Sequence, residues 1–345
     1  MRRIIQRFKS AARVLRYGDT PSGGVLEIPA ITPEEVAEAQ AIFPAAKFFI
    51  FGHARSGTTL LARLCRLHPD VHCNWQAHYF TRAPLLQSLV SAPEVADWLS
   101  QRSNRWNRGV DLSPVVLRAV GDYILERESR RLGKRIVGDK SPNSLMDGEA
   151  VRLLHNIYPD ARLLFIIRDG RDTLISHRIQ QFIDAPQHLG PADRKIRAAF
   201  AADRAPFLQG EASLFTPQAL RQAAGGWVKN LGETDSRAQA LFGNQYHCLR
   251  YEDLLAHPQA EMERVWEFLG APGSFSGCEA QIEAEMGRNP DADWQQEKRA
   301  DLAGNLSKGK AGSWREFFTP TDKALFKSVA GETLIAWGYE QDTHW

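Results

Sequence analysis

Short apolar runs alternate with amphipathic segments along most of the chain. The segments between the runs carry apolar residues three and four positions apart, which is typical of helices that pack on one face. Pro159 ends one such segment, and Gly270 ends another that begins near Pro258. Four runs have the length and composition of buried strands: Lys47–Phe51, Arg135–Gly138, Arg162–Ile167 and Tyr246–Leu249. This alternation predicts a three-layer α/β/α fold with a mainly parallel central sheet and ligands at the carboxyl ends of its strands.

Three stretches depart from the alternation, and we interpret them as additions to a single domain, 1–345. Residues 84–134 and 180–226 are rich in Arg, Trp and Pro, and we expect them to form helical caps that shape a substrate pocket. Residues 1–44 are predicted to form an N-terminal helical arm. Its first part, 1–16, has a basic and an apolar face, which favours packing on the protein itself or on a partner; peripheral contact with an anionic membrane is the alternative.

Composition excludes several classes of protein. The 345 residues carry 43 Lys and Arg against 41 Asp and Glu, and this net charge of +2 argues against nucleic-acid binding while allowing a local basic pocket. No apolar run approaches the ~20 residues of a membrane span. The basic N-terminal stretch also lacks the hydrophobic core of a signal peptide, so the expected location is the cytoplasm. Four scattered cysteines form no metal or redox motif.

The first predicted strand leads into a glycine-bearing loop, Gly-His-Ala-Arg-Ser-Gly-Thr-Thr, at 52–59. A nucleotide-triphosphate loop would carry lysine where Thr58 stands. The acidic residue that holds Mg²⁺ in such proteins is not evident either, because the run Arg162–Ile167 is followed by Arg168. Backbone N–H groups, a helix N-terminus and Arg55 still predict an anion site, and it needs no metal. A P-loop kinase or NTPase remains the alternative.

A second anion site is predicted after the third strand. Arg168 follows the strand, and Ser176 lies two helical turns further on if a helix begins near Asp169. Both side chains can then reach one phosphate group. Arg171 and Asp172 have a simpler explanation as a local salt bridge.

Four segments together resemble the sulfotransferases that use 3′-phosphoadenosine 5′-phosphosulfate (PAPS). They are the loop that begins at Arg55, the pair Arg168 and Ser176, the segment Tyr251-Glu-Asp-Leu, and a late Lys-Gly-x-x-Gly-x-Trp at 308–314. In that family these segments bind the donor, so the resemblance implies its P-loop fold. It also implies the following donor-binding residues: Arg55, Ser56, Gly57, Thr58, Thr59, Leu60, Arg168, Ser176, Tyr251, Lys308 and Gly309.

The resemblance also implies a reaction. A sulfonate moves from PAPS to a hydroxyl or amine of an acceptor, 3′-phosphoadenosine 5′-phosphate (PAP) is released, and no metal takes part. Arg55 and Lys140 are the expected catalytic cations. Gln76 stands where the tyrosylprotein branch has its catalytic glutamate; since glutamine accepts no proton at useful pH, Gln76 is predicted to orient the acceptor instead. His78 is our candidate base, with His53 and His72 as alternatives.

The sequence leaves the acceptor and the assembly state open. The acceptor is a carbohydrate, a metabolite, a phenol or a peptide, and a donor-binding protein that has lost catalysis is a further alternative. A zinc site at His68, His72, Cys73 and His78 is rejected because the spacing fits no metal motif.

Overall fold

The apolar runs form neighbouring strands of one parallel sheet. The computed structural model describes residues 27–81, 85–100, 106–142, 148–288 and 309–345. Its strand order is β2-β3-β1-β4-β5, and every neighbouring pair is parallel. The strands are β1 (Ala46–Phe51), β2 (Val71–Trp75), β3 (Ile136–Lys140), β4 (Arg162–Ile167) and β5 (Tyr246–Arg250). The predicted α/β fold with a parallel sheet is therefore confirmed.

The edge strand β2 (Val71–Trp75) is the one strand that the apolar-run criterion did not find. Its sequence Val-His-Cys-Asn-Trp alternates apolar and polar residues, a pattern typical of a strand. Polar residues such as Asn74 are tolerated there because the strand lies at the edge of the sheet and pairs with β3 alone. Alternation, rather than continuous hydrophobicity, was the signal for this strand.

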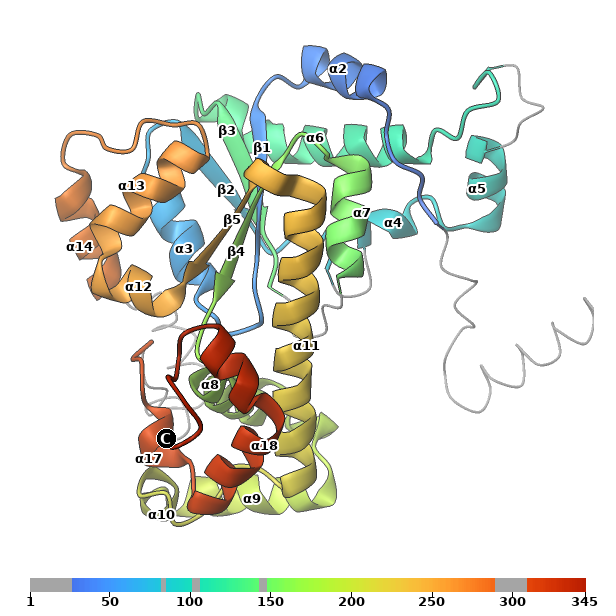
Figure 1. Cartoon of the computed structure of the whole chain (residues 1–345). Coiled ribbons are helices and arrows are strands. Elements are labelled where there is room, and N and C mark those ends of the chain that lie inside the picture. Colours follow the sequence, from blue (N-terminus) through green and yellow to red (C-terminus); the bar gives the residue numbers. More distant parts are fainter. Residues whose placement is uncertain (1–26, 82–84, 101–105, 143–147, 289–308) are drawn as a thin grey trace, which may run out of the picture.

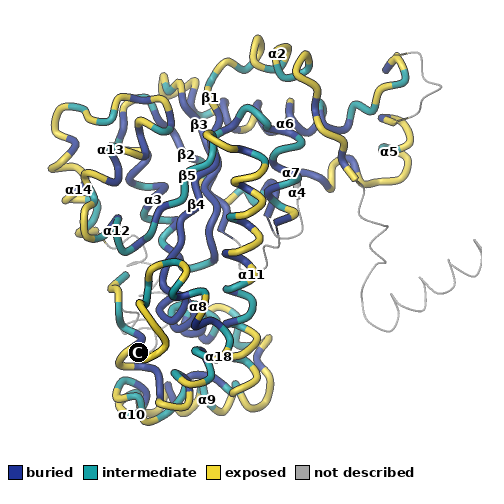
Figure 2. The backbone as a smooth tube through the Cα atoms, viewed as in Figure 1, coloured by how far each residue is buried: buried dark blue, intermediate teal, exposed yellow. Residues whose placement is uncertain are grey.

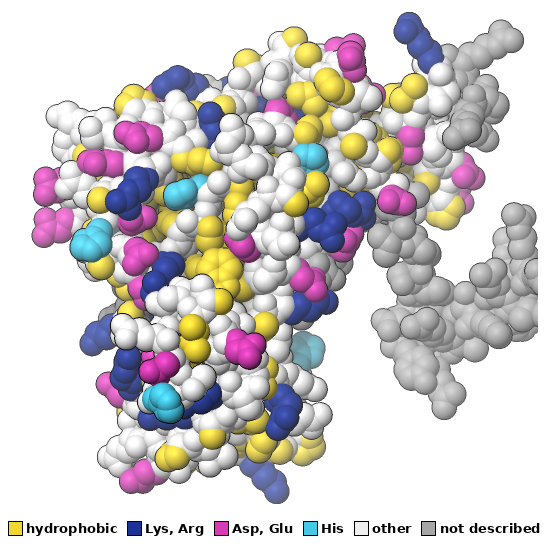
Figure 3. All heavy atoms as spheres, viewed as in Figure 1, with side chains coloured by type: hydrophobic (Ala, Val, Ile, Leu, Met, Phe, Trp, Pro, Cys, Tyr) yellow, Lys and Arg dark blue, Asp and Glu magenta, His cyan; other side chains and the backbone are white. Residues whose placement is uncertain are grey.

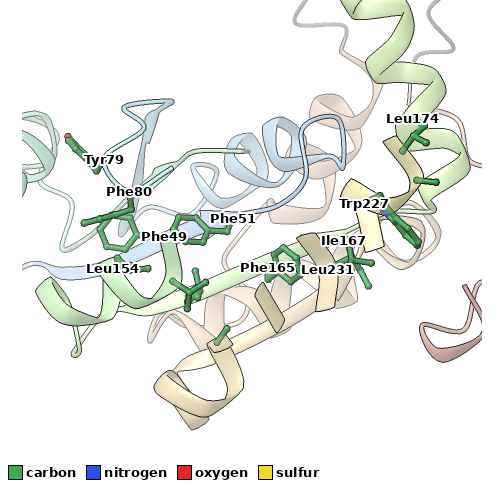
Figure 4. Close-up of a cluster of buried hydrophobic side chains, with 14 of the residues drawn as sticks. Phe49, Phe51, Tyr79, Phe80, Leu154, Phe165, Ile167, Leu174, Trp227 and Leu231 are labelled. Atoms are coloured by element: carbon green, nitrogen blue, oxygen red, sulfur yellow. The ribbon is translucent and has the colours of Figure 1, made fainter. Parts of the chain in front are cut away.

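Both faces of the sheet are buried. Along β1, Phe49 and Phe51 join one apolar cluster, while Phe48 and Ile50 join another on the opposite face. Figure 4 shows the first cluster, in which the strand residues meet side chains such as Leu154 and Trp227. Burial on both faces explains the continuous apolar runs, because parallel strands covered by two helical layers have no solvent-facing positions.

Two helical layers cover the sheet, and a further group of helices lies beyond the carboxyl ends of its strands (Figure 1). One layer contains α3 (Thr58–Cys65), α12 (Tyr251–Ala256), α13 (Pro258–Phe268) and α14 (Cys278–Gly287). The other contains α6 (Ser113–Arg131), α7 (Glu149–Ile157) and α11 (Pro217–Phe242). The third group contains α8 (Gly170–Asp184), α9 (Pro191–Ala202), α10 (Ala205–Leu208), α17 (Trp314–Phe317) and α18 (Pro320–Ala336). Figure 2 shows that α8 is buried almost as deeply as the strands. This helix lies between the ends of the strands and the other helices of the third group.

The predicted additions contribute to more than one part of the molecule. Residues 84–134 hold α4 (Leu85–Ser88), α5 (Pro93–Ser100) and α6, and α6 lies along β3 as part of a sheet layer. Residues 180–226 hold η1 (Pro186–His188), α9, α10 and the start of α11, while η2 (Gly243–Gln245) leads into β5. Of the predicted arm, α2 (Pro33–Ile42) is described, whereas the amphipathic segment 1–16 lies outside the described residues.

The described surface carries charges of both signs. On the face in Figure 3, Lys and Arg are interspersed with Asp and Glu, which agrees with the small net charge. Among the described helices, none is long and apolar enough to cross a bilayer.

Candidate functional site

The loop between β1 and α3 has the backbone of an anion cradle. Its residues Arg55 and Gly57 have φ angles of 75° and 93°, and α3 begins directly afterwards at Thr58. A Cβ atom at Gly57 would lie 2.1 Å from the Tyr251 ring, so only glycine fits there. The buried hydroxyl of Ser56 makes no hydrogen bond to any residue that the structure describes. A helix N-terminus with an unsatisfied hydroxyl beside it is suited to a phosphate.

The two predicted anion sites meet at Arg55 and Ser176. The Arg55 Nε donates to the Ser176 Oγ at 3.1 Å, although the two residues are 121 positions apart. Arg168 directly follows β4 and donates through Nη1 to the Arg55 carbonyl at 3.1 Å. Asp169 caps α8, so the predicted helix start is confirmed.

Arg168 keeps one donor unused. Its guanidinium also binds the Lys310 carbonyl at 3.0 Å and lies 4.8 Å from the centre of the Tyr251 ring. Its Nε is buried and has no hydrogen-bond partner among the described residues. An unpaired buried guanidinium N–H is costly without an acceptor, and a phosphate oxygen would supply one. The described side chains therefore fit a ligand with two anionic groups, as PAPS has.

Tyr251 holds the late segment against the loop. Its hydroxyl donates to the Gly309 carbonyl at 2.9 Å, and its ring packs on Gly57. Gly309 has a φ of 71°, and a Cβ there would meet the Tyr251 hydroxyl at 2.3 Å, so this position also requires glycine. Lys308, the other predicted contact of this segment, lies outside the described residues.

Asp172 anchors the same segment, and the predicted salt bridge between Arg171 and Asp172 is wrong. The Asp172 carboxylate accepts from the backbone N–H groups of Gly312, at 2.6 Å, and Trp314, at 2.8 Å. Arg171 instead pairs with Asp169 and Glu340. Asp169 is a near neighbour, but Glu340, Gly312 and Trp314 lie 140 or more positions away, which a local pattern does not show.

Lys140 lies at the carboxyl end of β3 and reaches the loop. Its ammonium group donates to the Thr59 Oγ1 at 3.3 Å and lies 4.3 Å from the centre of the Trp75 ring. Its neighbour Asp139 binds elsewhere, since its carboxylate accepts from the Ser141 hydroxyl and, at 3.0 Å, from the Ala77 N–H. The two side chains leave opposite faces of the strand, so Lys140 is directed at the anion cradle rather than paired with Asp139.

Gln76 and His78 follow β2 in unusual backbone conformations. Their φ angles are 56° and 52°, which are rare for residues other than glycine. The His78 N–H donates to the Ser141 Oγ at 2.8 Å, and its Nδ1 lies 2.8 Å from the Thr81 Oγ1. The Gln76 N–H donates to the Lys140 carbonyl at 2.9 Å. Both residues thus lie beside the strand end that carries Lys140.

The residues considered for zinc have separate surroundings. His68 packs against the rings of Trp266 and Phe275. The His72 ring lies 3.0 Å from the Asn74 side-chain oxygen, through its Nε2. Burial raises the pKa of the Cys73 thiol well above its ordinary value, which suits a core residue rather than a thiolate ligand.

The sequence profile of the sulfotransferase family matches residues 47–275. This span runs from β1 to just beyond α13 and includes the loop, Lys140, Arg168 and Ser176. The chain belongs to the sulfotransferase family. The resemblance inferred from four segments is thereby confirmed.

Several sulfotransferases with established names are similar to this one. Protein-tyrosine sulfotransferase A of Caenorhabditis elegans is 26% identical over 230 residues, which cover 65% of this chain and 50% of that protein. The protein-tyrosine sulfotransferase of Drosophila melanogaster is 25% identical over 228 residues, covering 65% and 38%. Heparan sulfate glucosamine 3-O-sulfotransferase 6 of Mus musculus is 28% identical over 144 residues, covering 42% and 32%. The chain spans half the length, or less, of these curated relatives.

Solved sulfotransferase structures resemble the fold more distantly. Mouse sulfotransferase SULT7A1 complexed with PAP aligns over 88% of this chain and 90% of that one, with a TM-score of 0.45 and 16% identity. The sulfotransferase domain from the curacin biosynthetic pathway aligns over 84% of this chain and 97% of that one, with a TM-score of 0.46 and 16% identity. The family assignment rests on the sequence match.

Sequence reasoning did not predict the contacts that three residues make at this site. Trp75 contacts Lys140, Asp172 holds the late segment, and Arg171 fixes the start of α8. A tryptophan at the end of an alternating strand was a usable signal for Trp75. The partners of the other two lie 140 or more residues away in most cases, so nothing local pointed to them.

Proposed function

We propose that this chain transfers a sulfonate group from PAPS to a hydroxyl or amine of an acceptor. The observation that carries the proposal is the meeting of Arg55, Arg168 and Ser176 around unsatisfied buried polar atoms. Membership of the sulfotransferase family supports the same activity.

The geometry of the described residues supports the proposed donor contacts, while the contact of Lys308 comes from the resemblance alone. The loop N–H groups and Ser56 would hold the 5′-phosphosulfate, while Arg168 and Ser176 would hold the 3′-phosphate, with Lys308 and Gly309 beside it. Tyr251 lies between these two regions, where an adenine ring can stack. When bound, the donor supplies an activated sulfonate. Arg55 and Lys140 would then stabilise the negative charge that develops on the leaving phosphate oxygen.

The acceptor class is inferred from the named relatives. Relatives named for protein tyrosine and for heparan sulfate glucosamine make peptide and carbohydrate hydroxyls the first acceptors to test, followed by phenols and metabolites. A kinase is disfavoured because the one carboxylate at the end of β3, that of Asp139, binds Ser141 and Ala77.

PAP binding without magnesium tests the proposed function. We expect PAP to raise the melting temperature in the presence of EDTA, and Arg168→Ala to weaken PAP binding about 10- to 100-fold, because a hydrogen bond to a charged group contributes about 1.5–3 kcal/mol. Isothermal titration calorimetry measures the Kd for PAP of the parent and of the variant. Arg131→Ala is the matched control, since that arginine is exposed at the far end of α6.

The outcomes separate the alternatives. A chain that binds ATP only with Mg²⁺, and not PAP, contradicts the proposal. PAP binding without transfer of labelled sulfonate to any acceptor in a panel of saccharides, peptides and phenols identifies a donor-binding protein that has lost catalysis.

A further inference from the structure

A cavity lies beside the anion loop, between α8, α9 and α11. Its volume is about 350 Å³, within the range of small-molecule sites. His53 of the loop and His177, the neighbour of Ser176, both line it, so the cavity borders the proposed donor site. The other lining residues come from the three helices and from the segment before α11: Leu174, Arg178, Gln181, Asp193, Phe215, Ala219, Gln222, Ala223 and Gly226.

His53 lines this cavity and carries a ring nitrogen that can accept a proton. Its Nδ1 lies 2.8 Å from the Ala54 carbonyl; since a carbonyl can only accept, Nδ1 carries the hydrogen and Nε2 keeps its lone pair. The Nε2 makes no hydrogen bond to any residue in the described part of the chain. Burial lowers the pKa of His53 to about 4, and His177 is edge-on to it at 5.9 Å between ring centres. The imidazole is therefore neutral at physiological pH and available as a base.

The surroundings of His78 differ. Its Nδ1 is engaged with Thr81, its backbone is fixed by Ser141, and it does not line the cavity. A base must come within hydrogen-bond reach of the attacking hydroxyl, and an acceptor held in the cavity is next to His53. The geometry thus favours His53 over the residue that the sequence suggested first.

The charged side chains that line the cavity, Arg178 and Asp193, neutralise each other. The Arg178 guanidinium donates hydrogen bonds to the Leu214 carbonyl at 3.0 Å and to the Gln181 side-chain oxygen at 2.9 Å, and it forms an ion pair with Asp193. The guanidinium and the carboxylate neutralise each other, while the amide N–H of Gln181 and the amide of Gln222 remain to bind hydroxyl groups. Leu174, Ala219 and Ala223 add apolar side chains to the lining. A cavity lined by both amide groups and apolar side chains suits the hydroxyls and the C–H groups of an uncharged sugar ring.

We propose that this cavity binds an uncharged, polyhydroxylated acceptor and that His53 removes the proton from its attacking hydroxyl. The proposal rests on the proposed sulfonate transfer. The hydroxyl oxygen forms a bond to sulfur while the bond between sulfur and the phosphate oxygen breaks, and that oxygen leaves with the electron pair as part of PAP. The hydroxyl proton passes to the His53 Nε2 and then to water.

The test compares matched variants with ³⁵S-labelled PAPS and three probes: methyl β-glucopyranoside, methyl β-glucuronide and 4-nitrophenol. We expect transfer to the uncharged sugar, at least tenfold less to the uronide, and a loss of kcat of at least 100-fold in His53→Gln with the Kd for PAP within twofold of the parent. Ala223→Phe should block the cavity, and the milder Gln222→Ala should raise the acceptor KM with little change in kcat. His188→Gln, an exposed histidine outside the cavity, is the control.

Each outcome decides the inference separately from the proposed function. Full kcat in His53→Gln, loss of kcat in His78→Ala alone, or a preference for the uronide or the phenol overturns it. A parent protein that binds PAP but transfers to none of the sugars also overturns it, leaving donor binding in place. If the parent protein does not bind PAP, the proposed function itself is contradicted.

Discussion

Single residues in strained backbone conformations mark the functional edge of the sheet. Among the described residues other than glycine, Arg55, Gln76, His78 and Arg108 have positive φ angles. Three of these four lie in the loop or beside Lys140. Such conformations cost about 1–3 kcal/mol each and persist only where the surroundings enforce them. The strain therefore points to the same edge as the unsatisfied atoms of Ser56 and Arg168.

The buried imidazole of His53 makes the stability of the fold depend on pH. Its pKa is 6.5 when exposed and about 4 in the fold, so between these values the unfolded chain binds the extra proton. Stability is then complete above about pH 6.5 and falls as the pH drops towards 4, by up to about 3 kcal/mol for this group.

We expect His53→Gln to lose less stability than the parent between pH 7.5 and pH 4.5, because glutamine does not titrate. Urea denaturation at the two pH values gives the difference. His177 has a pKa lowered chiefly by burial and then by Arg55 and Arg178, so it contributes in the same direction and stays in both proteins. Equal losses in parent and variant would show that His53 is not the buried titrating group.

At the scale of elements, α8 organises the donor site through its first turns. Its N-cap follows Arg168, its second turn carries Ser176, and Asp172 between them accepts two backbone hydrogen bonds from the late segment. One helix thus fixes both the arginine and the loop that closes on it. Gly170 allows this helix to pack on Trp227 of α11, since a Cβ there would meet the indole at 2.6 Å.

Asp172→Ala should release the late segment from α8. Both N–H groups lose a charged acceptor, each hydrogen bond being worth about 1.5–3 kcal/mol, and we expect the Kd for PAP to rise about tenfold or more. Calorimetric titration with PAP measures the change. Asp184→Ala on the same helix is the control, because that carboxylate is exposed and binds only Gln180 among the described residues. Equal affinities of the two variants would contradict the anchoring role of Asp172.

At the scale of the whole molecule, Arg171 joins the start of α8 to residues near position 340. Its guanidinium pairs with Asp169 at 2.7 Å and with Glu340, and it lies 3.8 Å and 4.4 Å from the ring centres of Trp314 and Trp345. The side chain is 1% exposed, so these contacts are desolvated. A buried charge held by partners from three segments fixes the third helical group against the sheet edge.

Glu340→Ala should destabilise the whole fold. Removing one partner of a buried ion pair leaves uncompensated charge and typically costs 3–5 kcal/mol; because Arg171 keeps Asp169, we expect about 3 kcal/mol. Urea denaturation at pH 7 measures the free energy of unfolding. Asp342→Ala, an exposed carboxylate two residues away, should change it by less than about 0.5 kcal/mol. Similar values for both variants would mean that Arg171 does not depend on Glu340.

The sequence by itself determined the parts that depend on neighbouring residues. Continuous apolar runs predicted β1, β3, β4 and β5, because strands buried on both faces must be apolar at every position. The glycine spacing predicted the loop, and Arg168 with Ser176 at a distance of two helical turns predicted a shared anion site. These features follow from local periodicity and from which residue types can bind a phosphate.

Tertiary structure alone decided which distant residues meet. It placed Asp172 on the late segment instead of on Arg171, Trp75 on Lys140, and His53 rather than His78 beside a cavity. No local pattern encodes these contacts, because each depends on how segments far apart in the sequence are brought together, by strand pairing for Trp75 and Lys140 and by helix packing for the others. The sequence therefore predicted an anionic ligand, whereas the residues that line the cavity proposed for the acceptor were decided by the packing of the helices.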